Sequence, residues 1–277
     1  MLGVNELISI RRLGFSYRGA AQPALNEINL EIGDGAVVAV LGANGCGKST
    51  LARLIGGMLT PSKGMVLVDG VDTTAIPAGW AMHQHVGMVF QNPQNQIVST
   101  VVENEVAFGL ENLLVDAKTM QARVDECLNL VGMTDLRLGN PHELSAGEQQ
   151  RLAIAGALAP APRHLLLDEA TSLLDDQSRM ELMATVKDLA QRLGLGVILI
   201  THRMDEVPIA DRVIVLAHGS VVFDAGPDLL FAEAERLAGW NLSLPPLQDM
   251  ALRFRQAGLP APADVHTPSD LAAALWP

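Results

Sequence analysis

Short apolar runs, separated by longer segments of helical spacing, dominate the pattern of hydrophobic and polar positions along the chain. Unbroken runs of this kind are typical of strands that are buried on both faces. Residues 25–32 differ, because their apolar positions alternate with polar ones as in an antiparallel strand that packs on one face only. The predicted strands are residues 7–17, 25–32, 36–41, 65–68, 86–90, 164–167 and 197–200.

Apolar residues three and four positions apart predict helices between these strands. One helix follows the run at 36–41, and its apolar positions are Leu51, Leu54, Ile55, Met58 and Leu59. From Val101 to Ala159 the strand pattern stops and the spacing is helical, which predicts a helical subdomain inserted into the fold. A later amphipathic helix carries Leu182, Val186, Leu189 and Leu193 on one face.

The C-terminal stretch predicts two further short helices. Pro245-Pro246 breaks the preceding helix, and an apolar stripe follows at the i, i+3, i+4, i+7 positions Leu247, Met250, Ala251 and Phe254. Thr267 as the cap and Pro268 at the first helical position predict the second helix. Helices this short are not stable alone. They therefore pack either on their own core or, as we expect, against the corresponding tail of a partner subunit.

A glycine-rich loop at residues 42–50, which reads GANGCGKST, lies between the apolar run 36–41 and a helical segment. This is the context in which the pattern G-x-x-x-x-G-K-[ST] predicts phosphate binding and not a chance glycine-rich turn. The glycines allow the backbone N–H groups to point inward, and together with the helix N-terminus they form a cradle for anions. Lys48 is expected to reach the β- and γ-phosphates and Ser49 to ligate Mg²⁺.

Polar residues follow two later apolar runs. Asp168 and Glu169 end the run that begins at His164, where a carboxylate beside a phosphate loop can hold Mg²⁺ and a second can orient the attacking water. An acidic cluster at the start of a helix is the structural alternative. His202 follows the run 197–200 and can reach a γ-phosphate, although a lone histidine is usually structural.

Two other residues have both a functional and a structural interpretation. Tyr17, the only tyrosine, can stack on a nucleobase or can be a core residue. Ser145 is expected to cap a helix, and such a helix N-terminus can bind an anion or be an ordinary cap.

Composition narrows the class of protein. With 19 Lys and Arg against 31 Asp and Glu, the net charge is −12 at pH 7, so nucleic acid is not an expected partner. The 2 cysteines give no disulfide framework. No window has the roughly 18 consecutive apolar residues of a membrane span, and the N-terminus lacks a signal-peptide layout, which predicts a cytoplasmic protein.

With these motifs assembled, residues 5–235 resemble the ATPase subunit of an ABC transporter. The matching positions are Tyr17 for the adenine-stacking aromatic, residues 42–50 for the phosphate loop, Gln91 for the loop glutamine, residues 144–148 (LSAGE) for the LSGGQ signature, Asp168 for the metal-binding aspartate, Glu169 for the catalytic glutamate, residues 172–175 for the dimer-contacting loop and His202 for the switch histidine. The signature departs from the family pattern at Ala146 and Glu148.

Within that family, residues 91–112 resemble the energy-coupling-factor (ECF) branch, which drives uptake of vitamins or of cobalt and nickel ions. The loop 171–175 resembles the first of the two ATPase paralogues of that branch, which also carries a C-terminal extension like residues 244–277.

The resemblance implies a fold, a site and partners. The fold is an α/β P-loop NTPase core with a mostly parallel sheet, an N-terminal antiparallel β-subdomain and an inserted helical subdomain at about 91–160. These make up an ATPase domain at 1–235, followed by a C-terminal helical extension at 236–277 that is expected to hold a dimer together. ATP binding is assigned to Tyr17, Gly42, Asn44, Gly45, Cys46, Gly47, Lys48, Ser49 and Thr50, with Ser145 and Gly147 reaching the partner's ATP. Catalysis is assigned to Lys48, Gln91, Glu169 and His202, and Mg²⁺ binding to Ser49, Gln91 and Asp168.

The implied function is that of the ATP-hydrolysing motor of a membrane importer, bound peripherally at the cytoplasmic face of the cell membrane. The expected partners are a second ATPase subunit, identical or paralogous, an integral membrane coupling subunit and a membrane substrate-binding subunit. One alternative is a soluble ABC ATPase of DNA repair or translation, and the other is a stand-alone P-loop enzyme such as a kinase.

Overall fold

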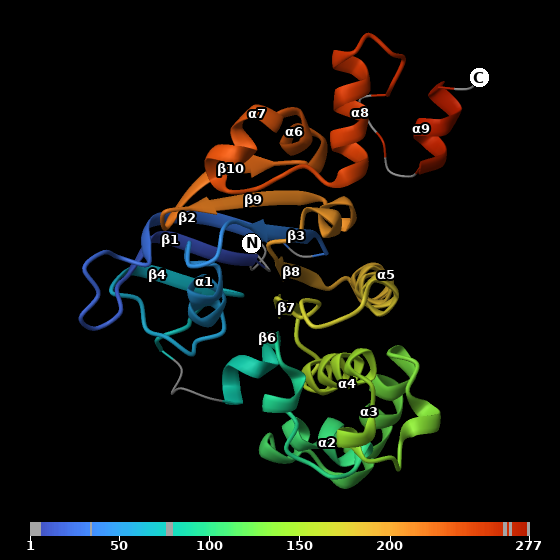
Figure 1. Cartoon of the computed structure of the whole chain (residues 1–277). Coiled ribbons are helices and arrows are strands. Elements are labelled where there is room, and N and C mark those ends of the chain that lie inside the picture. Colours follow the sequence, from blue (N-terminus) through green and yellow to red (C-terminus); the bar gives the residue numbers. More distant parts are fainter. Residues whose placement is uncertain (1–6, 34, 76–79, 263–264, 266–267, 276–277) are drawn as a thin grey trace, which may run out of the picture.

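Two β-sheets organise the structure, a computed structural model that describes residues 7–33, 35–75, 80–262, 265 and 268–275 (Figure 1). The smaller sheet has the strand order β2-β1-β4-β5 and is antiparallel. Its strands are β1 (Leu7–Phe15), β2 (Leu25–Gly33), β4 (Lys63–Val68) and β5 (Val71–Asp72). In β2 the alternating apolar residues are buried, which confirms the predicted one-sided antiparallel strand.

The larger sheet has the order β10-β9-β3-β8-β7-β6. Its five neighbouring strands β9, β3, β8, β7 and β6 are parallel to one another. The strands are β3 (Val37–Leu41), β6 (Val86–Phe90), β7 (His164–Asp168), β8 (Gly196–Ile200), β9 (Arg212–Ala217) and β10 (Ser220–Ala225). All residues of β3, β7 and β8 are buried, so the unbroken apolar runs are confirmed as central strands. The antiparallel pair of β9 and β10 lies where the sequence pattern predicted no element.

Helices cover both faces of the larger sheet. The α-helices are α1 (Lys48–Ile55), α2 (Val102–Asn112), α3 (Ala117–Leu130), α4 (Ala146–Leu158), α5 (Asp176–Leu193), α6 (Pro227–Ala232), α7 (Ala234–Leu237), α8 (Pro246–Gln256) and α9 (Pro268–Leu275). Short 3-10 helices lie at Trp80–Gln84, Pro93–Asn95, Thr134–Leu136, Pro141–Glu143, Met204–Ile209 and Ala238–Trp240. Among the described residues, none of the helices combines the length and the apolar composition needed to cross a membrane.

Strand alternation divides the interior into two cores. In β3, Val38 and Val40 face the smaller sheet and α1, whereas Val37, Ala39 and Leu41 face the opposite layer. The opposite layer includes the predicted helical subdomain, whose helices α2, α3 and α4 share one continuous core with the sheet and α5. The α/β fold with an antiparallel subdomain and inserted helices is therefore confirmed.

The helix after the phosphate loop is shorter than its apolar spacing predicted. It ends at Ile55, and Met58 and Leu59 lie beyond it. The chain reverses at Gly57, which has φ 69, a left-handed conformation that glycine adopts without steric cost. The expectation that Met58 and Leu59 continue the helix was wrong, and Met58 instead faces the cavity described below.

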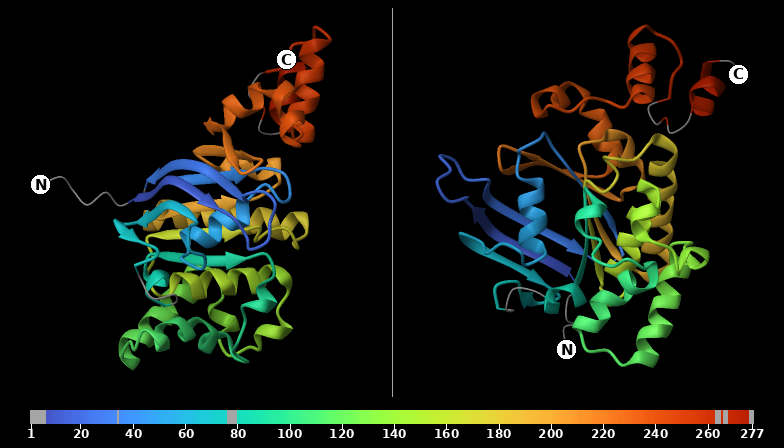
Figure 2. Two further views of the ribbon diagram at one scale, coloured as in Figure 1. Left: turned by 90° about the vertical axis from the view of Figure 1, so that its left-hand side faces the viewer. Right: turned by 60° about the horizontal axis from the view of Figure 1, so that its bottom comes forward.

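The C-terminal helices α8 and α9 project from the end of the molecule opposite the helical subdomain (Figure 2). Their buried residues Ala251, Val265 and Leu271 form a small core of their own, against which Leu247 and Phe254 pack. Most of the predicted apolar stripe thus finds its partner within the tail. Met250 is an exception, since it is 47% exposed. The cap predicted at Thr267 lies outside the described residues.

Candidate functional site

The glycine-rich loop joins the buried strand β3 to helix α1. Gly42 has φ 148 and Gly47 has φ 111. A Cβ at Gly47 would lie 2.6 Å from the carbonyl oxygen of Ala24, and one at Gly42 would lie 2.2 Å from that of Leu216. Both the backbone angle and the close approach of neighbouring backbone therefore require glycine at these positions.

A cavity of about 1150 Å³ opens beside this loop. It is large enough for a nucleotide, since typical small-molecule pockets have roughly 300–1,000 Å³. Of the site residues predicted from the sequence, the cavity is lined by Tyr17, Asn44, Gly45, Gly47, Lys48, Ser49, Thr50, Gln91, Asp168 and Glu169. Lining residues that the sequence analysis did not assign to the nucleotide site are Gln22, Pro23, Ala24, Arg53, Met58, Phe90, Asn92, Asn95 and Gln96.

Lys48 is folded onto its own loop. Its Nζ donates to the carbonyl oxygens of Gly42, at 2.7 Å, and Ala43, at 3.1 Å, and lies 3.9 Å from Glu169 Oε1. The side chain is only 4% exposed. The positively charged ammonium group of Lys48 thus lies beside the glycine-rich loop and its backbone N–H groups, an arrangement that attracts phosphate.

Ser49 and Asp168 are brought together although they are far apart in the sequence. The Ser49 hydroxyl donates to Asp168 Oδ1 at 2.9 Å. Burial raises the pKa of the Asp168 carboxyl, and the hydrogen bond from Ser49 acts against that rise. A hydroxyl and a carboxylate that converge in a polar cavity form the oxygen donor set that Mg²⁺ prefers, so these residues fit the predicted metal.

Glu169 lies between two basic groups. Its Oε1 is 3.9 Å from Lys48 Nζ and 3.6 Å from His202 Nδ1. The backbone of Glu169 has φ 52, a left-handed conformation that is unusual for a residue with a side chain, and its N–H donates to Ile200 O at 2.9 Å. Strained backbone of this kind clusters at functional sites. The ends of β7 and β8 thus bring Glu169 and His202 together, as the sequence predicts.

Tyr17 lies at the rim of the cavity and is 42% exposed. Its ring makes an edge contact with Phe15 at a centroid distance of 4.9 Å, and its hydroxyl lies 3.1 Å from Thr50 Oγ1. An exposed ring at the rim is placed to stack on a base, which favours the functional interpretation over a core tyrosine.

Gln91 follows β6 directly, and its side chain is exposed at the cavity. The fully buried side chain of Gln150 on α4 donates to the carbonyl oxygens of Phe90, at 3.3 Å, and Gln91, at 3.2 Å. Gln96 accepts from Phe90 N–H and donates to Met88 O, so it holds the end of β6. The loop that carries Gln91 is therefore tied to the helix that begins at the signature.

The signature residues begin α4 away from this cavity. Ser145 is the predicted N-cap and forms a capping box with Glu148. Ala146 has helical backbone as the first residue of the helix, so its replacement of glycine causes no strain. A Cβ at Gly147 would lie 3.2 Å from Ser178 Cβ. Ser145 and Gly147 are not among the described residues that line the cavity, which is consistent with the prediction that they serve a partner's nucleotide.

Cys46 faces the other side of the loop. Its side chain lines a separate cavity of about 250 Å³ with His218 and Trp240, and its N–H donates to Ala43 O. Burial raises the pKa of the thiol. The contact of Cys46 with the nucleotide therefore stays a prediction, and it can be made only by the backbone of this residue.

Comparisons with known proteins agree with this geometry. A profile of the family described as ABC transporter matches residues 25–172. The energy-coupling factor transporter ATP-binding protein EcfA1 of Symbiobacterium thermophilum is 48% identical over 252 residues, which cover 91% of this chain and 88% of that protein.

Solved structures agree as well. The structure of cbiO1 from Clostridium perfringens, described as part of the ABC transporter complex cbiONQ, has a TM-score of 0.76 and 36% identity and covers 88% of this chain and 97% of that one. The ATP-binding cassette MJ0796, in a dimeric post-hydrolysis state bound to ADP and Pi, has a TM-score of 0.70 and 28% identity over 79% of this chain and 98% of that one. The chain belongs to the ABC transporter family and, within it, to the ATP-binding proteins of energy-coupling factor transporters.

Proposed function

We propose that this chain is the ATP-binding and ATP-hydrolysing motor subunit of an ECF-type importer that takes up a vitamin or a transition-metal ion. The observation that carries the proposal is the convergence of the phosphate loop, the Asp168-Glu169 pair and Gln91 on one cavity, with His202 beside Glu169. The proposed partners are a second ATPase subunit, an integral membrane coupling subunit and a membrane substrate-binding subunit. These would hold the chain at the cytoplasmic face of the cell membrane.

Binding and neutralisation of the nucleotide depend on the loop. Lys48 exchanges the carbonyl oxygens of Gly42 and Ala43 for phosphate oxygens, and the N–H groups at the start of α1 donate to the same phosphates. Ser49, Asp168 and Gln91 would hold Mg²⁺, which supplies positive charge against the β- and γ-phosphates when it is bound.

Hydrolysis depends on the strand ends. Glu169 orients a water and accepts its proton while the water oxygen attacks the γ-phosphorus. The bond from that phosphorus to the β-phosphate bridging oxygen then breaks, and ADP and phosphate leave. His202 donates a hydrogen bond to the γ-phosphate. Glu169 Oε1 lies 3.9 Å from Lys48 Nζ and 3.6 Å from His202 Nδ1, so the groups assigned to hydrolysis are already close together.

Transport depends on a second subunit. Ser145 and Gly147 begin α4 outside the chain's own cavity, where they can close a partner's nucleotide site as the family resemblance implies. ATP then holds two subunits together, and hydrolysis releases them. The bonds from Gln150 to Phe90 O and Gln91 O would transmit this movement to the loop at the surface.

The membrane contact is proposed at the surface around residues 91–104. Gln94 and Val98 are exposed there, and Val98 is an exposed apolar residue next to the loop that carries Gln91. The sequence favours Gln94 and Gln96 equally for this contact, but the Gln96 side chain is bonded to the backbone of Phe90 and Met88 and supports β6, so Gln94 is the better choice. Val98→Glu with Gln94→Lys should abolish uptake and leave the ATPase activity of the purified chain largely intact. Uptake that survives the double substitution would place the contact elsewhere.

The proposal is tested by purification from membranes. The tagged full-length chain, extracted in mild detergent, should copurify with integral membrane proteins, and uptake in cells that carry this complex should stop with Lys48→Ala. Recovery with ribosomes or nucleic acid, without membrane proteins, would instead support the alternative of an ABC ATPase of translation or DNA repair.

A further inference from the structure

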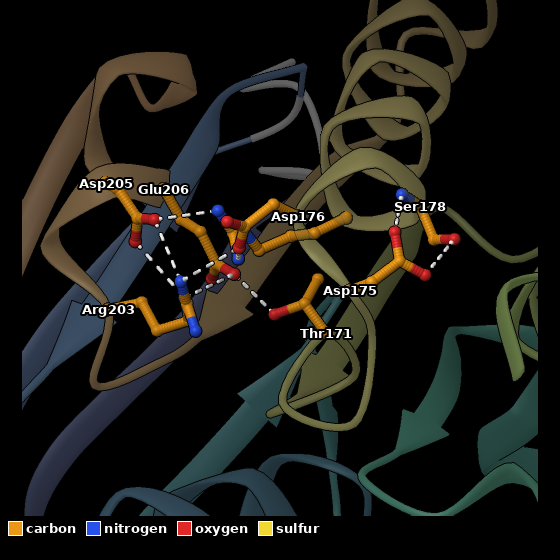
Figure 3. A network of polar contacts seen from close by, with 8 residues as sticks. Thr171, Asp175, Asp176, Ser178, Arg203, Asp205 and Glu206 are labelled. Atoms are coloured by element: carbon orange, nitrogen blue, oxygen red, sulfur yellow. Dashed lines mark hydrogen bonds and ion pairs between the residues drawn. The ribbon is translucent and has the colours of Figure 1, made fainter.

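A network of polar side chains joins the two loops that carry Glu169 and His202 (Figure 3). One loop leaves β7 and runs into α5, and the other leaves β8. At the centre of the network the Thr171 hydroxyl donates to Glu206 Oε1, although the two residues are 35 positions apart. Thr171 comes two residues after Glu169, and Glu206 comes four residues after His202. The contact therefore links the supports of two residues of the proposed active site.

The central contact is buried. Glu206 and Thr171 are each 2% exposed. Glu206 Oε2 has no hydrogen-bond partner among the described residues, and Arg203 Nε lies 3.9 Å from Oε1, too far for a hydrogen bond. Burial raises the pKa of the Glu206 carboxyl, against the hydrogen bonds from Thr171 and Thr201. A buried polar group of this kind is costly unless its hydrogen bonds are made, so the Thr171 contact is strongly preferred over its loss.

Ion pairs close the network at its exposed edge. Arg203 donates to both carboxylate oxygens of Asp205 at 3.2 and 3.0 Å, and Arg179 bridges Asp205, at 3.0 Å, and Asp176, at 2.6 Å. Two arginines thus face two exposed aspartates. The pair of Arg203 with Asp205 lies at the surface, where water screens it, and it contributes little. Arg179 itself is buried, so its ion pairs with Asp176 and Asp205 also tie α5 to the loop that carries His202. The contact of Thr171 with Glu206 is buried on both sides and begins two residues after Glu169, so it is the contact that can set the distance between the two loops.

We propose that Glu206 is a positioning residue, which fixes the placement of Glu169 relative to His202 by accepting a hydrogen bond from Thr171. At the base of the loop that carries His202, the Arg203 N–H donates to the Thr201 hydroxyl at 3.0 Å. Glu206 is not among the residues lining the nucleotide cavity. Its loss therefore changes the geometry of hydrolysis and leaves the groups that bind the nucleotide in place.

The expected effect is on turnover. A misplacement of about 1 Å between reacting groups can cost about a hundredfold in rate. Glu206→Ala and Thr171→Val should lower kcat by about ten- to a hundredfold, with KM for ATP and the Kd for nucleotide within about threefold of the wild type. Glu206→Gln keeps an oxygen acceptor without charge, so it should retain kcat within about threefold of the wild type.

The experiment measures kcat, KM and nucleotide Kd for these variants of the full-length chain, purified in the complex that it forms in the cell. Arg212→Gln is the matched control, since it removes an arginine that pairs with Asp224 across β9 and β10 and does not line the nucleotide cavity, and it should leave kcat unchanged. Thr171→Val decides the matter if Glu206→Ala does not fold, because it keeps the side-chain volume.

Three results would overturn the inference: wild-type kcat in Glu206→Ala and Thr171→Val, loss of nucleotide binding in step with kcat, or a Glu206→Gln variant as inactive as Glu206→Ala. The inference rests on the proposed function, and Glu169→Gln in the same assay separates the two. If Glu169→Gln loses turnover and Glu206→Ala does not, only the positioning role fails. If Glu169→Gln retains wild-type turnover, the proposed catalytic assignment fails as well.

Discussion

Replacing Tyr17 with leucine is expected to weaken ATP binding while the fold is retained. The ring is 42% exposed at the rim of the nucleotide cavity, and its contacts with Phe15 and Thr50 fix its orientation. Stacking of a base on an aromatic side chain contributes about 1–3 kcal/mol. Since about 1.4 kcal/mol is a tenfold change, the Kd for ATP should rise about five- to 150-fold in Tyr17→Leu. Isothermal titration calorimetry with ATP measures this directly.

Tyr17→Phe is the matched control, because it keeps the ring and removes only the hydroxyl that lies 3.1 Å from Thr50 Oγ1. Its Kd should stay within about threefold of the wild type. ATP and a triphosphate without a base should then differ in affinity in the wild type and in Tyr17→Phe, but much less in Tyr17→Leu. An unchanged Kd in Tyr17→Leu would refute base stacking and leave Tyr17 as a surface residue.

Three other changes test separate parts of the account. Lys48→Ala removes a charge-assisted contact worth about 1.5–3 kcal/mol, so the Kd for ATP should rise at least about tenfold, and an unchanged Kd would contradict phosphate binding by Lys48. Truncation after Leu244 removes α8 and α9, whose core is separate from the main one, and should leave a folded domain that sediments as a monomer without ATP. A truncated chain that stays dimeric would contradict the prediction that the tail holds the dimer together. Burial raises the pKa of Glu206 above its value in the unfolded chain, so this group contributes stability below the unfolded pKa that is lost as pH rises through the folded pKa. The Tm of Glu206→Gln relative to the wild type should therefore increase as the pH rises from the ordinary pKa of a glutamate through the raised pKa of Glu206, and a constant difference would contradict the buried carboxyl.

The strands and the site could be predicted from the sequence for physical reasons. Strands β3, β7 and β8 are buried on both faces, so their residues leave an unbroken apolar run that no helix face would show. Parallel strands end at one edge of the sheet, and residues that follow them, such as Glu169 and His202, therefore meet.

Other features depend on contacts between distant segments. The strand β10 is half-buried without alternation, so it has no period to recognise. The burial of Gln150 depends on the carbonyl groups of Phe90 and Gln91, about 60 residues away, which the local pattern does not contain. The contact of Thr171 with Glu206 joins two loops in the same way. By contrast, the early end of α1 had a local signal, since Gly56-Gly57 follows Ile55 directly.

The most direct test of the central claim is the turnover and oligomeric state of Glu169→Gln. The substitution removes the proton acceptor and keeps the size of the side chain, while Lys48 and the glycine loop remain in place. General-base catalysis contributes about a hundred- to ten-thousandfold. ATP hydrolysis should therefore fall at least about a hundredfold and ATP should still bind. In the chain truncated after Leu244, Glu169→Gln should sediment as a monomer without nucleotide and accumulate as a dimer with Mg²⁺ and ATP. Hydrolysis at the wild-type rate, or loss of ATP binding together with turnover, would contradict the account.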